Sequence, residues 1–507
     1  DNTDPYSYMM IDLAPYKSVT KIRFRAIRGS NYYGDMAIDD VQIYDLPPVD
    51  AAVVNVTEPV TPASAGVQDV KVRIANNGAS VLNNVTINWS IDGIMQTPVL
   101  YSTPLLSLDT SAAITLGSHN FSIGVTNIRV FTSNPNGVAD TLNANDTLDV
   151  PIVVCGTGLA GTFTVGAPGN DFESLTQANE VLHTCGIASP VVFEITPGEY
   201  EEQIDITSVV GSSAVNTITF TSSTGNAADV VVKFEGTATA NNYVVKVNGA
   251  DHMIFSDFTL KGTGASYSHA LEFTGGTNNL TFDGMIFEGA LTLAGTSTNN
   301  AVVYSTSSLD TNTTFRNCQV LNGSIGMYLY NSSSTIDVNL LVENCTITGF
   351  SNYGINAYYH TNGIIRNNTI ISADGSNAAT TVYALRPYYF DFGTVTGNKV
   401  VARGTGTNYG LYAYYLDGAT GSEGIVANNF ISAGRAGNTS TVYGMYMGTN
   451  TYLNVYANSV NVINGATTSR AFYLTGGSNY NIVDNIFANH GGGHAYYIGT
   501  IAAVLSS

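Results

Sequence analysis

An internal repeat constrains the fold of this 507-residue chain more than any other feature. Nine six-residue strings of similar pattern, such as Phe315–Val320 (FRNCQV), follow one another between residues 255 and 488. Seven of the nine carry Asn at the third position, and successive third positions lie 23 to 33 residues apart. These third positions are Asp257, Gly284, Asn317, Asn344, Asn367, Asn398, Asn428, Asn458 and Asn485. A recurrent Asn at variable spacing excludes a coiled coil and predicts a solenoid whose coils extend insertions into loops.

Asn suits the repeated position for two reasons. Its backbone tolerates the left-handed αL conformation, and stacked side-chain amides can form hydrogen bonds from one coil to the next. Two strings that precede the first repeat, Val191–Ile195 and Pro197–Tyr200, resemble the beginning of pectate-lyase-like β-helices. The repeat and this resemblance together predict an all-β fold in which residues 157–507 form a right-handed parallel β-helix.

A helix and two cysteines mark the start of the predicted β-helix. Residues Phe172 to His183 carry apolar side chains at helical spacing, with Asp171 as the expected N-cap, and such a helix would cover the open first coil. Cys155 and Cys185 flank this segment, and we expect a disulfide that closes a loop of about 30 residues and stabilises the fold by roughly 3 kcal/mol. The alternative is a pair of buried thiols.

The other two cysteines, Cys318 and Cys345, occupy the same repeat position in adjacent strings. Adjacent coils of a β-helix are separated by about 4.8 Å, which lies within the Cα separation that a disulfide allows. A disulfide and a stacked pair of free thiols are therefore both consistent with the sequence.

Two changes in composition, at Leu46–Pro48 and at Cys155–Gly158, divide the chain before the β-helix. Residues 49–154 contain short apolar runs separated by turn residues, which predicts an immunoglobulin-like β-sandwich. The expected strands are Ala52–Val54, Val70–Ile74, Val85–Ile91, Ala113–Leu116, Ile128–Phe131 and Leu148–Val153. The runs Val70–Gly78 and Val85–Gly93 resemble the CARDB-type spacers of bacterial surface proteins.

The run Arg28–Ile43 (RGSNYYGDMAIDDVQI) resembles the closing strands of MAM-like jelly-roll domains, which implies that residues 1–46 are the C-terminal part of such a domain. Asp35, Asp39 and Asp40 are candidate Ca²⁺ ligands, because a hard cation requires several oxygens at close range. The alternative, which we favour, is that the adjacent aspartates fix a turn. The histidines are scattered, and no cluster at metal-ligand spacing predicts a zinc site.

Acidic residues outnumber basic residues by 38 to 18, which gives a formal net charge of −20. This balance repels phosphate backbones and excludes nucleic acid as a partner. Charged residues make up only 11% of the chain, so neutral polar groups must cover the surface, as suits an extracellular or cell-surface protein. No apolar run predicts a membrane span, and the first residues lack the pattern of a signal peptide. We therefore expect a fragment of a longer exported protein.

A second series of strings, rich in tyrosine, runs beside the Asn series. Side chains along a strand point alternately inward and outward. The inward set is Met327, Ile355, Leu385, Leu411, Met445 and Phe472. The outward side chains form two rows, namely Tyr328, Asn356, Arg386, Tyr412, Tyr446 and Tyr473 in one row and Tyr330, Tyr358, Tyr388 and Tyr414 in the other.

Exposed aromatic rows suit glycans, because sugar rings can stack their C–H faces on aromatic rings. The candidate ligand-binding residues are therefore Tyr328, Tyr330, Tyr358, Tyr388, Tyr412, Tyr414 and Tyr446. The alternative is structural, since cross-strand aromatic pairs stabilise a sheet by about 0.2 to 1 kcal/mol each without any ligand. The sequence leaves both interpretations open.

A catalytic interpretation needs clustered carboxylates for acid/base work or for binding Ca²⁺. Asp391 and Asp417 align on adjacent coils, with Arg386 a short turn away and His360 on the coil below. Two carboxylates one coil apart would share a proton or bind a cation. Both aspartates also lie where strands end, which is typical of solvated turn residues. Asp391, Asp417 and Arg386 are therefore kept as the catalytic alternative only.

The leading hypothesis is a non-catalytic adhesin or filament-type module that binds glycans or cell surfaces. The module order resembles surface proteins that gliding bacteria export by the type-nine route, and Asp140–Leu142 and Asp146–Leu148 resemble the O-glycosylation sequences of such bacteria. The resemblance implies that secretion machinery recognises a domain beyond Ser507. The alternative is a polysaccharide lyase or glycoside hydrolase of the β-helix type.

Overall fold

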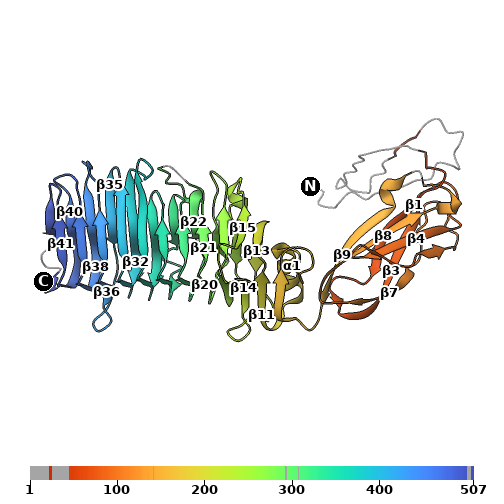
Figure 1. The fold of residues 1–507 in the computed structure, drawn as a ribbon, viewed down its shortest axis with the longest axis horizontal. Coiled ribbons are helices and arrows are strands. Elements are labelled where there is room, and N and C mark those ends of the chain that lie inside the picture. Colours follow the sequence, from red (N-terminus) through yellow and green to blue (C-terminus); the bar gives the residue numbers. More distant parts are fainter. Residues whose placement is uncertain are drawn as a thin grey trace.

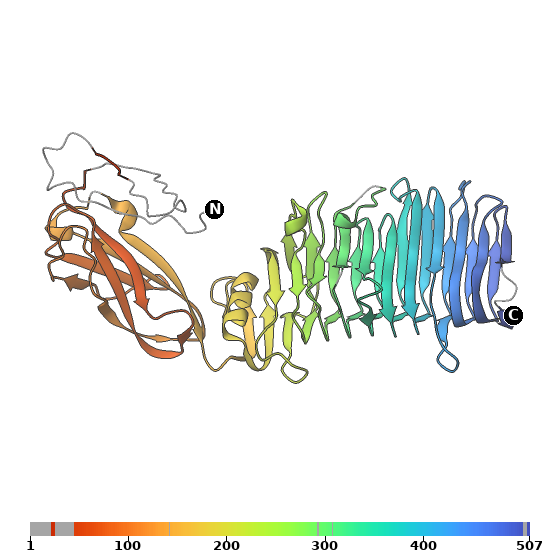
Figure 2. The same ribbon diagram turned by 180° about the vertical axis from the view of Figure 1, so that it is seen from behind.

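The computed structural model describes residues 22–25, 45–140, 142–291, 294–306, 308–499 and 504–506. These residues form a β-sandwich followed by a long parallel β-helix, with one described α-helix between them (Figures 1 and 2). The predicted fold class is confirmed for both parts. The MAM-like run Arg28–Ile43, and with it Asp35, Asp39 and Asp40, lies outside the described residues.

The sandwich consists of two sheets, one with strand order β1-β3-β7 and one with order β2-β9-β8-β4-β5, in which β6 also pairs with β4. The strands are β1 Ala51–Glu58, β2 Ala63–Ser64, β3 Gly66–Asn76, β4 Val85–Ile91, β5 Ile94–Met95, β6 Val99–Tyr101, β7 Ile114–Phe121, β8 Gly124–Ser133 and β9 Thr147–Cys155. Alternating apolar side chains such as Val70, Val72 and Trp89 fill the core between the sheets. All six predicted strands overlap observed ones. The strands that sequence periodicity missed, β2, β5 and β6, have only two or three residues.

From β11 onward the coils of the β-helix pass through three faces, which we call A, B and C in the order in which the chain reaches them, and β10 precedes them on face A. Face A contains β10 Leu159–Val165, β11 Ile187–Ile195, β14 Ile218–Ser222, β17 Met253–Ser256, β20 Thr281–Asp283, β23 Thr314–Arg316, β27 Leu341–Glu343, β30 Ile364–Arg366, β33 Thr394–Thr396, β36 Gly424–Ala427 and β43 Val504–Ser506. Face B contains β12 Gly198–Glu201, β15 Val230–Phe234, β18 Thr259–Gly262, β21 Ile286–Glu288, β24 Gln319–Leu321, β28 Thr346–Thr348, β31 Thr369–Gly375, β34 Lys399–Gly404, β37 Phe430–Ala433, β39 Ser459–Val462 and β41 Ile486–Asn489.

Face C contains β13 Ile204–Thr207, β16 Val245–Asn248, β19 Leu271–Thr274, β22 Ala301–Thr306, β25 Ile325–Tyr330, β29 Tyr353–Thr361, β32 Thr381–Asp391, β35 Thr407–Ala413, β38 Val442–Tyr456, β40 Arg470–Val483 and β42 His494–Ile498. The longest of these strands, β38 and β40, continue round the corner and pair along face A as well. The short strand β26 (Asp337–Val338) lies at the same corner. Faces A and C are therefore joined in one sheet, whereas face B is a separate sheet.

Corresponding residues of successive coils lie above one another, because parallel strands pair residue to residue. On face A, Phe255 pairs with Phe282, and Phe282 pairs with Phe315. Their buried rings stack with centroid separations of 5.2 and 4.9 Å. The interior of the β-helix is thus built from columns of like side chains.

The repeated Asn proves to be two neighbouring columns rather than one. The first column has φ between 54° and 69° and comprises Asp257, Gly284, Asn317, Asn344, Asn367, Gly397, Asn428, Ala457 and Asp484. The second column follows it by one residue and comprises Phe258, Met285, Cys318, Cys345, Asn368, Asn398, Asn429, Asn458 and Asn485. Strand pairing shows that the predicted alignment was wrong by one residue for the strings beginning at Thr396, Tyr456 and Val483. The cause is that Asn suits both columns.

The second column is an amide ladder from Asn368 to Asn485. Each side-chain Nδ2 donates to the Oδ1 of the Asn on the next coil at 2.9 to 3.0 Å, and that Oδ1 also accepts the backbone N–H of the preceding Asn. Cys345 lies at one end of the ladder and donates its N–H to Asn368. Cys318 and Cys345 are both free and buried, so the structure contains the stacked pair of thiols.

The α-helix α1 (Leu175–Cys185) covers the first coil, as predicted. Its N-cap is Ser174, whose hydroxyl accepts a hydrogen bond from the N–H of Gln177 at 3.0 Å. The prediction of Asp171 as the N-cap was wrong. The Asp171 carboxylate instead accepts the N–H and the hydroxyl of Thr164, because it is held against strand β10.

The predicted disulfide between Cys155 and Cys185 is confirmed. Cys155 is the last residue of the sandwich strand β9, and Cys185 is the last residue of α1. The disulfide therefore connects the sandwich to the helix that covers the β-helix, in addition to closing a loop within the chain.

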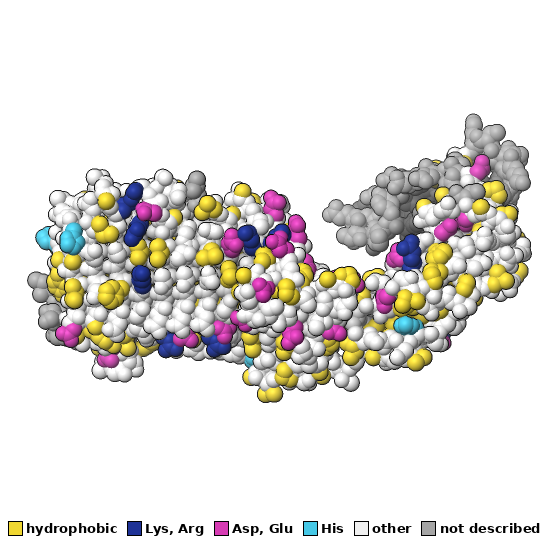
Figure 3. Space-filling view, in the orientation of Figure 1, with side chains coloured by type: hydrophobic (Ala, Val, Ile, Leu, Met, Phe, Trp, Pro, Cys, Tyr) yellow, Lys and Arg dark blue, Asp and Glu magenta, His cyan; other side chains and the backbone are white. Residues whose placement is uncertain are grey.

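The surface carries few charges for its size. On the side shown in Figure 3, acidic side chains gather near α1 and over the first coils, whereas the later coils are mostly uncharged. The longest helix among the described residues is α1, with 11 residues, and no described helix is long and apolar enough to cross a membrane.

The amide ladder predicts a large effect of Asn429→Ala. This change leaves the buried N–H and side-chain amide of Asn398 without their acceptor, and it should lower the free energy of unfolding by about 2 to 4 kcal/mol. The control is Asn428→Gly, because Asn428 is exposed and its column already contains glycine. Denaturant unfolding monitored by circular dichroism checks both variants. Equal stability of the two would contradict a structural role for the ladder.

Candidate functional site on the tyrosine face

The tyrosine-rich strings lie on face C, from β22 to β42. The predicted inward residues are all fully buried, namely Met327, Ile355, Leu385, Leu411, Met445 and Phe472. The outward rows are in register across coils, with Tyr330 paired to Tyr358, Tyr358 to Tyr388, and Tyr388 to Tyr414. The predicted alternation of this face is therefore confirmed, and we call its outward surface from β22 to β42 the tyrosine face.

The rings of the tyrosine face stack on one another along the column. Tyr358 lies between Tyr330 and Tyr388, with centroid separations of 4.7 Å on each side, and the Tyr388–Tyr414 separation is 5.3 Å. Two further stacked rows were not predicted, Tyr353, Tyr383, Tyr409 and Tyr443 in one and Tyr359, Tyr389 and Tyr415 in the other. The signals for these rows were the Tyr that begins most strings and the recurrent Tyr-Tyr pair.

This stacking determines what the face offers to a ligand. All seven candidate tyrosines are half-buried rather than exposed. Neighbouring rings cover both faces of rings inside a row, such as Tyr358 and Tyr388, so solvent reaches mainly the edges of these rings with their hydroxyl groups. Burial raises the pKa of Tyr328 to about 12 and raises the pKa of Tyr358 and Tyr388. The hydroxyls therefore stay protonated at neutral pH and act as hydrogen-bond donors and acceptors.

Arg386 is a cation in the middle of the tyrosine rows. Its guanidinium carbon lies 4.8 Å from the ring centroid of Tyr388 and 5.5 to 5.7 Å from four other tyrosine rings. Its Nη1 donates to Asn356 Oδ1 at 3.0 Å. Arg386 Nε and Asn356 Nδ2 are buried donors without a hydrogen-bond partner, and no carboxylate of the described residues pairs with Arg386.

Asp391 and Asp417 lie at the corner between faces C and A. The pKa of Asp391 is raised, chiefly by burial and further by the charge of Asp417. Asp417 Oδ1 accepts the N–H and the hydroxyl of Thr451 at 2.8 and 2.9 Å. The structure thus places the two carboxylates together, but Arg386 points among the tyrosines and makes no described contact with either.

His360 belongs to a different cluster, which the sequence did not reveal. It is buried, and its Nδ1 lies 3.7 Å from Asp337 Oδ2. Asp337 Oδ1 in turn accepts the N–H of Asp310, whose own carboxylate accepts three hydroxyl groups and one backbone N–H. The three residues line a cavity of about 10 Å³, the space of about one water molecule.

Burial shifts the pKa values within this cluster in opposite directions. The pKa of Asp337 is raised to about 7 by burial and then by the charge of Asp310, and burial lowers the pKa of His360 to about 4. Both shifts favour the uncharged forms. Because these shifts make protonation differ between the folded and unfolded states, we expect the cluster to make the stability of the β-helix depend on pH.

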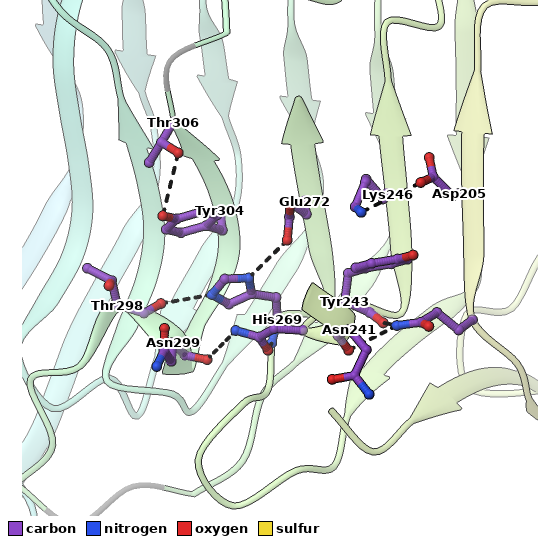
Figure 4. A network of polar contacts seen from close by, with 12 residues as sticks. Asp205, Asn241, Tyr243, Lys246, His269, Glu272, Thr298, Asn299, Tyr304 and Thr306 are labelled. Atoms are coloured by element: carbon purple, nitrogen blue, oxygen red, sulfur yellow. Dashed lines mark hydrogen bonds and ion pairs between the residues drawn. The ribbon is translucent and has the colours of Figure 1, made fainter. Parts of the chain in front are cut away.

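The outward row that contains Tyr304 begins with charged residues. In coil order it consists of Asp205, Lys246, Glu272, Tyr304 and Tyr328. Lys246 Nζ lies 3.6 Å from Asp205 Oδ2 and 3.9 Å above the ring of Tyr243 (Figure 4). The tyrosine face therefore adjoins a small polar region toward the first coils.

His269 joins this polar region to the tyrosines. Its ring stacks on Tyr304 with a centroid separation of 4.3 Å (Figure 4). Its Nε2 lies 2.8 Å from the Thr298 carbonyl, and because a carbonyl only accepts, Nε2 carries a proton. Its Nδ1 lies 3.5 Å from Glu272 Oε2. No local sequence pattern marks His269, because Thr298 and Tyr304 lie on the next coil and are about 30 residues away in sequence.

No protein-family model and no curated protein matches the chain. Among solved structures, the CARDB domain of the PF1109 protein from Pyrococcus furiosus, in complex with di-metal ions, covers 24% of this chain and 99% of its own length, with 13% identity and a TM-score of 0.19. The surface adhesin PfbA of Streptococcus pneumoniae covers 65% of this chain and 89% of its own, with 11% identity and a TM-score of 0.39. The alignment with the GH136 lacto-N-biosidase from Eubacterium ramulus covers 64% of this chain and 67% of that protein, with 9% identity and a TM-score of 0.36. These likenesses concern the fold alone and do not distinguish an adhesin from an enzyme.

The shifted pKa of Asp337 predicts a pH-dependent stability. An acid whose pKa is about 7 when folded and 3.8 when unfolded binds more protons in the folded state, so stability falls as pH rises from about 4 to about 7. Asp337→Asn removes this loss, and we expect it to stabilise the protein at pH 8 by on the order of 2 kcal/mol, with a smaller difference at pH 5. Denaturant unfolding at pH 5 and pH 8 measures the difference in the free energy of unfolding between the variant and the wild type. The exposed Asp374→Asn serves as the control, and a pH-independent effect of Asp337→Asn would refute the assignment.

The stacked rows predict that the tyrosines stabilise the β-helix. Replacing Tyr358, Tyr388 and Tyr414 together by Ser should lower the melting temperature markedly, since each aromatic pair contributes about 0.5 to 1.5 kcal/mol beyond its buried area. The matched control is the triple change to Phe, which keeps the stacking and should change the melting temperature little. Thermal unfolding checks both. A Ser variant as stable as the wild type would show that the stacking contributes nothing.

Proposed function

We propose that this chain is a non-catalytic module of a cell-surface protein, which binds glycans through the hydroxyl groups at the ring edges of the tyrosine face. The observation that carries the proposal is Arg386, a cation among tyrosine rings that has no carboxylate partner in the described structure. No Asp or Glu occurs on the face C strands from β25 to β42 except Asp391 at the corner. The face therefore has the means to bind sugar oxygens but lacks the acids that hydrolysis requires.

A rigid rim of hydroxyl groups suits polysaccharides. The stacked rings hold their hydroxyls at a regular spacing before any ligand arrives, so binding costs little side-chain entropy. Arg386 is half-buried, and its guanidinium has N–H donors beyond the one that binds Asn356, which favour a ligand that supplies oxygen acceptors. The guanidinium favours acidic sugars in particular, because it pairs with carboxylates and sulfates.

The disulfide supports an extracellular location, since such bonds persist in oxidising compartments. In this proposal, residues 1–46, 49–154 and 157–507 are three domains, of which the first two are spacers. A MAM-like first domain and export by a type-nine-like route rest on the sequence resemblance alone. Secretion machinery and glycans or cell surfaces are the partners that the proposal implies.

A second candidate function is that of a polysaccharide lyase or glycoside hydrolase. Asp391 and Asp417 on adjacent coils favour it, because the pKa of Asp391 is raised while Thr451 holds the Asp417 carboxylate with two hydrogen bonds. Two carboxylates in different environments are one arrangement used for acid/base catalysis. Arg386 makes no described contact with either carboxylate and lies among the tyrosine rings, which makes this the weaker candidate.

The triple variant Tyr358→Phe, Tyr388→Phe, Tyr414→Phe tests the proposal. It retains the stacked rings and loses three hydroxyls, so we expect binding on a glycan array to fall at least tenfold while the melting temperature is preserved. Arg386→Gln should reduce binding to acidic glycans more than to neutral ones. The exposed Arg403→Gln on face B is the control.

The same protein preparation distinguishes a binding module from an enzyme. Incubation with acidic and neutral polysaccharides should yield no new reducing ends and no unsaturated products. Products that form with the wild type and disappear in Asp391→Asn or Asp417→Asn would establish catalysis and overturn the proposal. Unchanged glycan binding by the Phe variant would exclude the tyrosine hydroxyls as the binding surface.

A further inference from the structure

Three aspartates that are far apart in sequence meet at one end of the sandwich. Asp50 directly precedes β1, and Asp140 and Asp146 lie on the connection between β8 and β9, on either side of the short 3-10 helix η3 (Asn143–Asn145). One carboxylate oxygen from each lies within 4.8 Å of the others. Asp50 is 0% exposed, Asp146 is 9% exposed, and Asp140 is half-buried.

The cluster has fewer hydrogen-bond donors than its oxygens can accept. Asp140 accepts the N–H groups of Ala51 and Leu142, and among the described residues the Asp50 carboxylate accepts only the side-chain amide of Asn145. Asp146 Oδ1 is buried without any partner, and so is the side-chain oxygen of Asn145. Native proteins rarely leave such atoms unpaired, so the unpaired oxygen of Asp146 points to a group that completes the site.

No positive side chain balances the cluster. Among the described residues, none of the three aspartates forms a salt bridge with Lys, Arg or His. Burial raises the pKa of Asp146 to about 6, with further contributions from the charges of Asp140 and Asp50, which is consistent with the crowding of like charges. A buried group of carboxylates needs a compensating charge from elsewhere.

We propose that Asp50, Asp140 and Asp146 bind a divalent cation, with Ca²⁺ as the expected ion. All the available ligands are oxygens, which hard cations prefer and which exclude a zinc site built from Cys or His. A loop and the start of a strand supply them, and Ca²⁺ accepts such irregular geometry more readily than Mg²⁺ does. Water molecules would complete the coordination.

The location of the site indicates what the cation does. Asp50 lies two residues after Pro48, where the chain from residues 1–46 reaches the sandwich. The Asp50 carbonyl already accepts the N–H of Asn77, and the adjacent Ala51 carbonyl accepts the hydroxyl of Thr132. The ion would fasten this first segment to the β8–β9 connection and so stiffen the junction between two consecutive parts of the chain.

Calcium titration of the whole chain tests the proposal. Trp89 is the one tryptophan of the chain and is buried in the sandwich core, so its fluorescence reports on this domain. After treatment with a chelator, CaCl₂ should raise the unfolding midpoint of the Trp89 signal, and KCl of equal ionic strength should not. Calorimetry should show one Ca²⁺ per chain, bound more tightly than Mg²⁺.

Variants locate the site. Asp146→Asn should weaken Ca²⁺ binding at least tenfold and abolish the calcium-dependent shift. Asp149→Asn, an exposed acid on β9 that lies 3.7 Å from Arg129, should leave both unchanged. The proposal is wrong if CaCl₂ gives the wild type neither a heat of binding in calorimetry nor a higher unfolding midpoint. It is also wrong if Asp146→Asn binds Ca²⁺ as tightly as the wild type does. An Asp146→Asn variant that is merely more stable, beside a wild type indifferent to calcium, would show a repulsive acidic cluster and would also overturn it.

Discussion

The hydrogen bonds between successive coils are the interaction on which the rest of this structure depends. Parallel pairing aligns each residue with its counterpart one coil away, so any residue type that recurs is placed in contact with itself. Phenylalanines then stack inside, amides form a ladder along the corner after face A, and tyrosines stack outside. A side chain is favoured at a position if it interacts well with a copy of itself, which explains why Asn, Phe and Tyr recur and why charged residues are few.

On the tyrosine face, the scaffold and the proposed recognition surface need not be alternatives. Stacking uses the ring faces, which would otherwise be the natural platform for a sugar ring, and leaves the ring edges and hydroxyls to solvent. The contacts that stabilise the column thereby define the chemistry that it can present. A ligand of this face would be bound through hydrogen bonds and, at Arg386, through charge.

The sequence predicted what a repeat can encode. The β-helix, its covering helix, the disulfide and the inward and outward residues of face C follow from periodicity and spacing. The separation of the Asn column into two could not be predicted. Positions 367 and 368 are both Asn, so an alignment shifted by one residue still places Asn on Asn. Clusters such as Asp337 with His360, or Asp50 with Asp146, depend on side chains brought together by coil stacking or by sandwich topology, and no local pattern marks them. The extent of ring stacking was also beyond the sequence, since periodicity shows which side chains face outward but not how they lean.

The connection between the two domains has a mechanical consequence. The hydrogen bonds that join the coils run along the long axis of the β-helix, so a pull along that axis loads them one coil at a time, and the coil nearest the applied force would peel away first. Tension arriving from the sandwich meets the disulfide between Cys155 and Cys185 before it reaches the first coil. That covalent bond diverts the load into α1, which is packed over the open end of the column. The first coil, from which peeling would begin at this end, is therefore protected by a covalent bond that stays intact at forces that break hydrogen bonds.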